Sequence, residues 1–261
     1  MARVLKFFIV YHDKVYQENT AGFTPKEIQD NFVWYAANEK LPKQLPTWGP
    51  VLKEWEMSYH DPLLQMNQYF QNSAFFHLYK NQHLIESKYI GFGQYDMKIE
   101  PTSFRTMVTH LDATFLSTFV GCFLYSFDNL GNCVDWHGTF MEPYNKFHGT
   151  NYKLADISQN PLVLLHTFIM PTIHFVDMMR FAEHVLPIVI KNLGWDMKHF
   201  AGTMERVFAL WILFAMARGK FKKIIKLDGI THVDSQCTTD RQARNKVENL
   251  KTLLERPRCL N

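Results

Sequence analysis

Lys88-Tyr-Ile-Gly-Phe-Gly-Gln-Tyr-Asp-Met97 is the stretch that decides the fold of this chain of 261 residues. Its first half is apolar and lacks the alternation of a half-exposed strand, so it predicts a strand covered on both faces. Gly91 and Gly93 would let another backbone or a ligand come close. Polar character returns at Gln94-Tyr95-Asp96. The stretch therefore predicts a central strand that carries Asp96 at its carboxyl end, where open α/β sheets bind their ligands.

The rest of the chain is predicted to alternate between strands and helices. A first buried strand is predicted over 4–11, and the capping box Thr24-Pro25-Lys26-Glu27 starts a helix over 25–38. The remaining predicted strands cover 51–57, 118–127, 162–170 and 221–227. The remaining predicted helices cover 62–84, 103–111 and 176–193, with an interruption or kink at Pro187 in the last of these. Residues 201–206 lead into a final apolar helix with the run 207–216. This order favours one α/β domain over 1–261, with a Rossmann-type, mostly parallel sheet flanked by helices and a C-terminal helix over 239–254.

Composition and charge narrow the class of protein. Hydrophobic residues make up 47% of the chain and charged residues 20%, as in a globular domain. The net charge of +3 is too small to indicate a nucleic-acid partner. The four cysteines match no zinc or disulfide spacing and the N-terminal residues show no secretion signal, so we expect a cytoplasmic protein with free thiols. The basic run 218–223 could make a peripheral contact with a membrane, although the longest apolar run, 207–217, is too short to span one.

Polar residues at the ends of predicted elements are the candidates for chemistry. Asp96 could bind a divalent cation that clamps the phosphates of a nucleotide, or it could only start a turn or cap the next helix. His12 and Asp13 follow the first strand, where they would contact the base or ribose of a nucleotide or form an exposed turn. Glu205 is predicted in the first turn of an apolar helix, where it would act as a catalytic base, bind a sugar hydroxyl, or only complement the helix dipole.

The segment 132–160 is long and weakly patterned, which is typical of a functional loop. It contains Trp136 and His137 among glycine, asparagine and proline. Aromatic and amide groups of this kind could stack on an acceptor sugar and form hydrogen bonds with it. We therefore expect an acceptor-side loop here, with a disordered or purely structural insertion as the alternative.

A strand that ends in a short acidic motif, an acidic helix start and a late histidine together resemble the GT-A class of nucleotide-sugar glycosyltransferases. In that class an Asp-any-Asp motif, and sometimes a late histidine, holds manganese or magnesium on the donor diphosphate. Gln94-Tyr95-Asp96 matches the motif in its last acid, and His232 is the late ligand that the resemblance implies.

A second resemblance is to a poorly characterised family of bacterial capsule and exopolysaccharide glycosyltransferases. The stretch Phe75 to Asn81 followed by Tyr89-Ile90-Gly91 is similar to that family's aromatic-rich helix and Tyr-Ile-Gly strand. The later stretches that resemble it are His166 to Met170, Phe181 to Pro187, and Glu205 to Phe208 with Trp211. Family members usually carry His-Tyr-Arg where this chain has Gln94-Tyr95-Asp96.

Together the resemblances imply a GT-A-like fold and an enzyme that moves a sugar from a nucleotide diphosphate donor to a glycan or lipid-linked acceptor. The residues assigned to this activity are catalytic Glu205 and Asp96, nucleotide-binding His12, Asp13, Gln94 and Tyr95, substrate-binding Trp136, His137 and His166, and Asp96 and His232 as ligands of Mn²⁺ or Mg²⁺. Two other classes stay open at this point. One is a catalytically inactive carbohydrate-binding or scaffold protein, and the other is a metal-dependent nucleotide phosphohydrolase.

Overall fold

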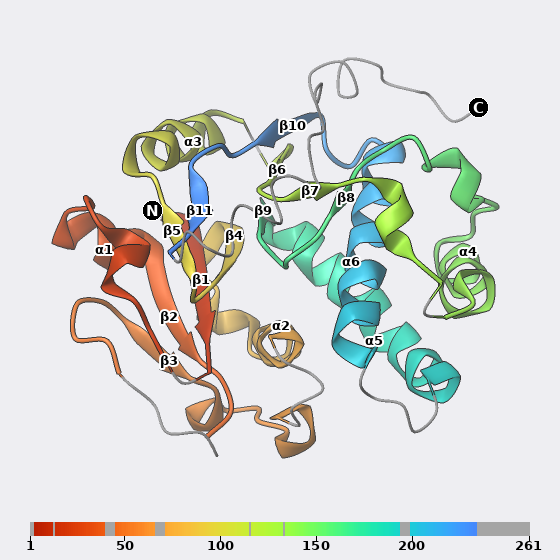
Figure 1. Cartoon of the computed structure of the whole chain (residues 1–261), viewed down its shortest axis with the longest axis horizontal. Helices are drawn as coiled ribbons and strands as arrows, with labels where there is room; N and C mark the ends of the chain where they lie inside the picture. The colour runs from red at the N-terminus through yellow and green to blue at the C-terminus, as the bar shows by residue number, and fades with distance from the viewer. Residues whose placement is uncertain are drawn as a thin grey trace.

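The computed structural model describes residues 3–12, 14–39, 45–65, 71–114, 116–132, 134–193 and 199–233. The helix expected over 239–254 lies outside these residues. Within them, seven strands form one mixed sheet in the order β10-β6-β9-β4-β1-β2-β3, with helices on both faces (Figure 1). The prediction of an α/β fold with a mostly parallel sheet is confirmed.

The sheet is parallel except for β9. Its strands are β1 (Arg3–Tyr11), β2 (Phe32–Ala36), β3 (Val51–Lys53), β4 (Ser87–Gln94), β6 (Thr118–Gly121), β9 (Phe168–Pro171) and β10 (Lys223–Lys226). β9 lies antiparallel between β4 and β6. Two short antiparallel pairs accompany the sheet: β5 (Met97–Ile99) with β11 (Ile230–His232), and β7 (Leu124–Tyr125) with β8 (Leu162–Val163). Because β9 is reversed, its first residue lies at the same edge as the last residues of β1 and β4.

β1 stands at the centre of the core because both of its faces are covered. Phe8 packs in the cluster that contains α2 (Asn72–Lys80), α5 (Thr172–Leu193) and α6 (Phe200–Ala217). Phe7 packs in the cluster with α1 (Pro25–Asn31) and α3 (Pro101–Ala113), on the opposite side of the sheet in Figure 1. Gly91 of β4 is needed here, since a Cβ would lie 2.4 Å from Phe7 Cδ2. The group that comes close to Gly91 is thus the ring of Phe7 in the core, and not the backbone or ligand expected from the sequence.

The helix predicted over 25–38 is wrong beyond Asn31. The capping box forms as expected, with the Glu27 backbone N–H donating to Thr24 Oγ1 at 3.2 Å, but the chain enters β2 at Phe32. All five residues of β2 are buried, because the strand is paired on both sides and covered on both faces. Aromatic and branched side chains suit such a strand better than a helix.

Several other predicted elements are shorter or divided. The segment 51–57 forms β3 and η2 (Glu54–Glu56), 118–127 forms β6, β7 and the start of η5 (Phe127–Leu130), and 162–170 forms β8 and β9. Within 62–84, the described residues form η3 (Pro62–Gln65), α2 and η4 (Gln82–Leu84). A short helix that was not predicted, η1 (Gln17–Thr20), follows the first strand. Helix α5 runs through Pro187 to Leu193 without interruption. The sequence pattern thus predicted where these elements lie but not how long they are.

The segment 132–160 is more ordered than the expected loop. It contains the π-helix η6 (His137–Met141), α4 (Glu142–His148) and the short helix η7 (Leu154–Asp156). The ring of Tyr144 lies 5.4 Å from that of Phe181 and 4.9 Å from that of Phe214, between centroids. Much of this segment therefore belongs to the hydrophobic core formed with α5 and α6.

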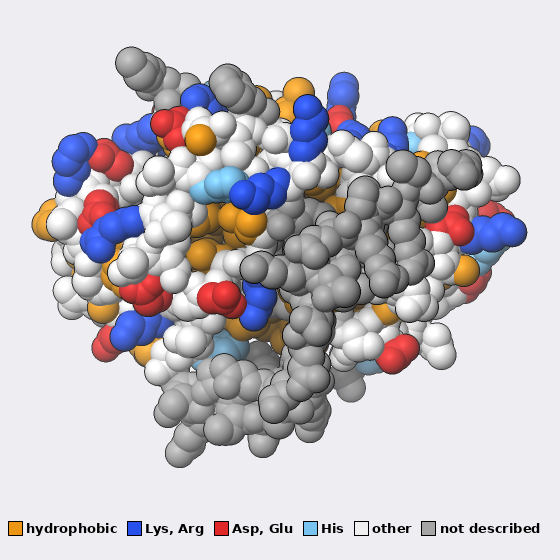
Figure 2. Space-filling model, turned by 90° about the horizontal axis from the view of Figure 1, so that it is seen from above, with side chains coloured by type: hydrophobic (Ala, Val, Ile, Leu, Met, Phe, Trp, Pro, Cys, Tyr) orange, Lys and Arg blue, Asp and Glu red, His pale blue; other side chains and the backbone are white. Residues whose placement is uncertain are grey.

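Helix α6 is long and apolar enough to cross a membrane, judged by its 18 residues and its mean hydropathy of 1.4. Sixty-seven per cent of that stretch is buried inside the protein. A core helix has the same composition, so its burial accounts for the apolar run. The surface seen from above in Figure 2 shows Lys and Arg side chains interspersed with Asp and Glu.

Candidate functional site

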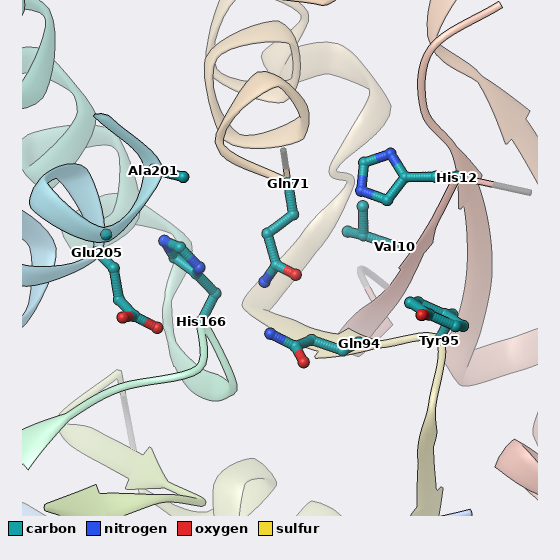
Figure 3. A pocket seen from close by; sticks show the side chains of 9 residues that line it. Val10, His12, Gln71, Gln94, Tyr95, His166, Ala201 and Glu205 are labelled. Carbon is teal, nitrogen blue, oxygen red and sulfur yellow. The ribbon is translucent and has the colours of Figure 1, made fainter. Parts of the chain in front are cut away.

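A cavity of about 310 Å³ opens at the edge of the sheet where β1 and β4 end (Figure 3). Its described lining residues come from five places in the chain: Val10 and His12, Gln71, Gln94 and Tyr95, His166, and Ala201, Gly202 and Glu205. His166 reaches this edge because it precedes the reversed strand β9. Five residues singled out from the sequence, His12, Gln94, Tyr95, His166 and Glu205, are thus brought to one cavity.

The turn between β4 and β5 is fixed to the end of β1. The Tyr95 backbone N–H donates to the Val10 carbonyl at 3.1 Å. Asn19 Nδ2 donates to the carbonyls of Tyr95 and Met97, each at 2.6 Å. Asp96 therefore sits in a turn that is held from both sides, at the carboxyl end of the strand as the sequence predicts.

The structure brings Asp96 and His232 into contact across 136 residues of sequence. Asp96 Oδ2 lies 3.2 Å from His232 Nδ1, because β5 and β11 pair with His232 opposite Met97. His232 is buried, and the other carboxylate oxygen, Asp96 Oδ1, is buried without a hydrogen-bond partner among the described residues. These two side chains could supply a carboxylate and an imidazole to a cation. No third His, Cys, Asp or Glu joins them within the described part of the chain.

A strained turn precedes β9. Leu165 and His166 have φ values of +60° and +48°, in the left-handed region that residues with a side chain rarely adopt. The Leu165 N–H donates to Glu205 Oε1 at 2.6 Å, and its carbonyl accepts from Gln94 Nε2 at 3.2 Å and from Thr167 Oγ1 at 2.8 Å. Strain of this kind persists only where surrounding contacts hold it, and it clusters at functional sites.

His166 is a neutral side chain in this site. Burial lowers the pKa of its imidazole to about 3. The rings of Phe75 and Phe208 lie edge-on to it, at centroid distances of 5.1 Å and 5.8 Å. At neutral pH the ring therefore offers one N–H donor and one nitrogen acceptor and carries no charge.

Tyr95 presents an aromatic surface to the cavity. Its ring stacks on that of Tyr16, with centroids 6.2 Å apart and planes inclined by 16°. Tyr16 lies just before η1, which also carries Asn19, so one short segment supports the β4–β5 turn in two ways. Tyr16 and Asn19 belong to no motif, and a search of the sequence for polar residues at strand ends misses both.

The remaining predicted site residues lie elsewhere or outside the described chain. Trp136 is buried and its Nε1 donates to the Gly131 carbonyl at 2.8 Å, while the exposed His137 contacts Glu142 at 3.3 Å. Neither lines this cavity. Asp13 lies outside the described residues.

The predicted setting of Glu205 needs correction. Helix α6 begins at Phe200, so Glu205 is in its second turn, away from the end where the helix dipole acts most strongly. The sequence placed the helix start too late because the apolar run begins only at Val207. Its carboxylate is directed to the Leu165 N–H.

Comparisons with known proteins show the fold. No protein-family model matches the chain, and no curated protein matches it. Among solved structures, the apo form of the WbbM bifunctional glycosyltransferase aligns with TM-score 0.59 and 13% identity, over 89% of this chain and 46% of that one. Glucosyl-3-phosphoglycerate synthase from Mycobacterium tuberculosis, in complex with Mn²⁺, UDP and phosphoglyceric acid, aligns with TM-score 0.44 and 9% identity, over 92% of this chain and 74% of that one. The fold is GT-A-like α/β, and the chain spans less than half the length of WbbM.

Proposed function

We propose that the protein is a glycosyltransferase that moves a sugar from a nucleotide diphosphate donor to a glycan or lipid-linked acceptor. The observation that carries this proposal is the contact between Asp96 and His232. Neither residue is among the described residues that line the cavity, but Tyr95, the neighbour of Asp96 in the β4–β5 turn, is. Open α/β sheets bind ligands outside the carboxyl ends of their strands, and the cavity lies at that edge. The fold supports the same class, since the solved structure that it matches at TM-score 0.59 is a glycosyltransferase.

Asp96 and His232 would hold a divalent cation, Mn²⁺ or Mg²⁺. Asp96 Oδ1 is buried and lacks a hydrogen-bond partner among the described residues, and a cation would give it one. A carboxylate and an imidazole suit Mn²⁺ somewhat better than Mg²⁺, which prefers oxygen alone. When bound, the ion would neutralise the negative charge that grows on the leaving diphosphate.

Side chains on the two sides of the cavity would contact different parts of the donor, its nucleotide and its sugar. His12, Gln94 and Tyr95 lie at the ends of β1 and β4, where they would contact the nucleotide, with the Tyr95 ring as a stacking surface. His166 lies at the opposite side of the cavity, beside Glu205, and would contact the sugar (Figure 3). In the reaction the bond from the sugar carbon to the diphosphate oxygen breaks and its electron pair leaves with the nucleoside diphosphate. A bond from the same carbon to the acceptor oxygen forms, and the proton of the acceptor hydroxyl passes to a base, a role for which Glu205 is the candidate in this cavity.

The test is a thermal-shift and turnover panel with UDP-, GDP- and dTDP-sugars, each with and without Mn²⁺. A ligand that binds the folded protein alone raises its Tm. We expect one nucleotide to raise the Tm in a metal-dependent way, and Asp96→Asn to abolish this effect and the transfer of sugar. Asp112→Asn is the matched control, because Asp112 is an exposed carboxylate in α3 that pairs only with Lys88 at 3.3 Å among the contacts given by the structure.

The same panel separates the other two classes. Binding of glycans without any turnover of a donor would favour a carbohydrate-binding or scaffold protein. Release of phosphate from nucleotides without an acceptor would favour a phosphohydrolase. Turnover that is unchanged in Asp96→Asn would remove this carboxylate from the mechanism.

A cytoplasmic location, which the buried free thiol of Cys122 suits, is part of the proposal.

A further inference from the structure

Two buried polar groups in the cavity lack partners within the described chain. Gln71 Nε2 and His166 Nε2 are each inaccessible to solvent and make no hydrogen bond with the described residues. Both residues are only 7% exposed, and both line the cavity. Buried polar atoms in folded proteins are nearly always paired with protein groups or ordered water. These two lie in one cavity, where a bound ligand could take the place of water as their partner.

The two groups face the same region from different elements. Figure 3 shows the Gln71 side chain extending from the start of α2 toward Gln94, with His166 beside it. An amide and a neutral imidazole match hydroxyl groups, which both donate and accept hydrogen bonds. Their convergence indicates a ligand that presents several hydroxyls on one rigid body, as a sugar ring does.

The carboxylate of Glu205 at this side of the cavity disfavours a sugar ring that carries an acid. Glu205 contributes a carboxylate beside His166, and burial keeps His166 uncharged. Neither Lys nor Arg is found among the described residues that line the cavity. A sugar carboxylate placed here would meet the carboxylate of Glu205, which disfavours binding. Arg206 Nη1 lies 3.7 Å from Glu205 Oε2, but it donates to the Gly202 carbonyl and Arg206 is not among the described residues that line the cavity.

Glu205 has a structural task in this arrangement. Its Oε1 accepts the Leu165 N–H at 2.6 Å, while Gln94 and Thr167 hold the Leu165 carbonyl from the other side. The peptide is thus clamped at both ends in a left-handed turn, and this turn aims His166 at the cavity. An acceptor oxygen at position 205 is what the clamp requires, and a glutamine would also supply one.

We propose that Gln71 and His166 form a sugar-recognition subsite that selects an uncharged, hydroxyl-bearing ring over a uronic acid, with Glu205 as the residue that positions His166. This inference rests on the proposed function and names the substrate class of the same cavity. Gln71 and His166 determine specificity by direct contact with the sugar. Glu205 acts through the backbone of Leu165.

The test measures the Kd of the full chain for UDP, UDP-glucose, UDP-galactose and UDP-glucuronate, and for GDP and GDP-mannose, by calorimetry with Mn²⁺ present. We expect at least one neutral sugar nucleotide to bind about tenfold more tightly than its free nucleotide, and UDP-glucuronate to show no such gain. Gln71→Ala and His166→Ala should each remove about tenfold of this gain and leave the Kd of the free nucleotide unchanged.

The outcomes distinguish this inference from the proposed function. If free nucleotides bind but UDP-glucuronate binds as tightly as the neutral sugars, or if the two alanine variants weaken free and sugar-bearing nucleotides alike, the subsite is refuted and the transferase stands. If no nucleotide binds here and none raises the Tm in the panel with UDP-, GDP- and dTDP-sugars, both proposals fall.

The positioning role of Glu205 has its own comparison. Glu205→Gln should keep the preference for the neutral sugar within about threefold, because the amide oxygen can still accept the Leu165 N–H. Glu205→Ala should lose the preference to the same extent as His166→Ala. A Glu205→Gln variant that loses it as fully as Glu205→Ala would overturn the positioning role. Thermal melts of both variants establish that each is folded.

Discussion

Replacement of Glu54 by glutamine is expected to destabilise the fold strongly, because Glu54 is a carboxylate with no solvent exposure. Its Oε1 accepts hydrogen bonds from Tyr35 Oη at 3.1 Å and from His77 Nδ1 at 2.7 Å. Its Oε2 accepts the Asn38 backbone N–H at 2.9 Å. His77 Nε2 accepts the Asp61 N–H at 2.9 Å, so the ring donates to Glu54 through Nδ1. The network joins the ends of β2 and β3 to α2.

The magnitude follows from the charge and the number of bonds. Burial raises the pKa of Glu54, but hydrogen bonds from His77, Asn38 and Ser73 outweigh it and lower the pKa overall, so the group is ionised at neutral pH. A glutamine keeps one acceptor oxygen and turns an N–H toward a donor. The loss of one charge-assisted bond and the burial of an unpaired donor cost about 3 kcal/mol. At about 2–4 °C per kcal/mol, the Tm should fall by about 6–12 °C.

The assay is thermal unfolding by circular dichroism at pH 7, with Glu56→Gln as the control. Glu56 is 58% exposed and pairs with Lys53 at 2.7 Å, so its loss should move the Tm by less than about 2 °C. Because the folded pKa of Glu54 is lowered, its stabilisation is present above the unfolded value near 4.5 and is lost as the pH falls through the folded value. The gap between wild type and Glu54→Gln should therefore close in acid. A fall in Tm under about 2 °C at pH 7 would refute the reasoning.

Three other substitutions test separate features. Asn19→Ala removes two hydrogen bonds of 2.6 Å to the β4–β5 turn, so urea unfolding should show a free energy of unfolding lower by about 2 kcal/mol. Calorimetry should show weaker metal-dependent nucleotide binding, and unchanged binding would contradict the role of Asn19 as an anchor of this turn. Gly91→Ala places a Cβ 2.4 Å from Phe7 Cδ2 and should cost about 1–3 kcal/mol by overpacking, and an unchanged urea midpoint would contradict this. Hydrogen bonding, first of all from Arg105, lowers the pKa of Glu27 to about 2, so its stabilisation is present above the unfolded value near 4.5 and is lost toward pH 2. The difference in Tm between wild type and Glu27→Gln should shrink across that range, and a constant difference would argue against it.

The parts of the fold that could be predicted from sequence are those in which local pattern and burial agree. The central strand β4 has an apolar run that ends in polar residues, and the rule that ligands bind at strand ends predicted three of the nine described residues that line the cavity. His12, Gln94 and Tyr95 all follow from that rule. The same rule predicted the position of Asp96. Its contact with His232 depends on the pairing of β5 with β11, two strands that are far apart in sequence.

The parts that could not be predicted depend on tertiary context. The run Phe32–Ala36 is apolar throughout and follows a capping box, so the sequence predicted that the helix continues through it, whereas its neighbours in the sheet make it a strand. The left-handed turn at Leu165 and His166 has no glycine or asparagine to announce it. Gln71 is an ordinary amide that becomes notable only because its Nε2 is buried in the cavity without a partner in the described chain.

The reversed strand β9 also governs the order in which the protein can be completed during synthesis. β1, β2, β3 and β4 pair with one another and are all present once residue 94 has left the ribosome. β9 must then insert against β4 before β6 and β10 can join that half, and Glu205 arrives later still. Pairings this distant in sequence form slowly, because a long loop must close first. On the growing chain, the side of the cavity that carries His12, Gln94 and Tyr95 is therefore assembled before the side that carries His166. A chain truncated before residue 168 would leave an open edge on β4.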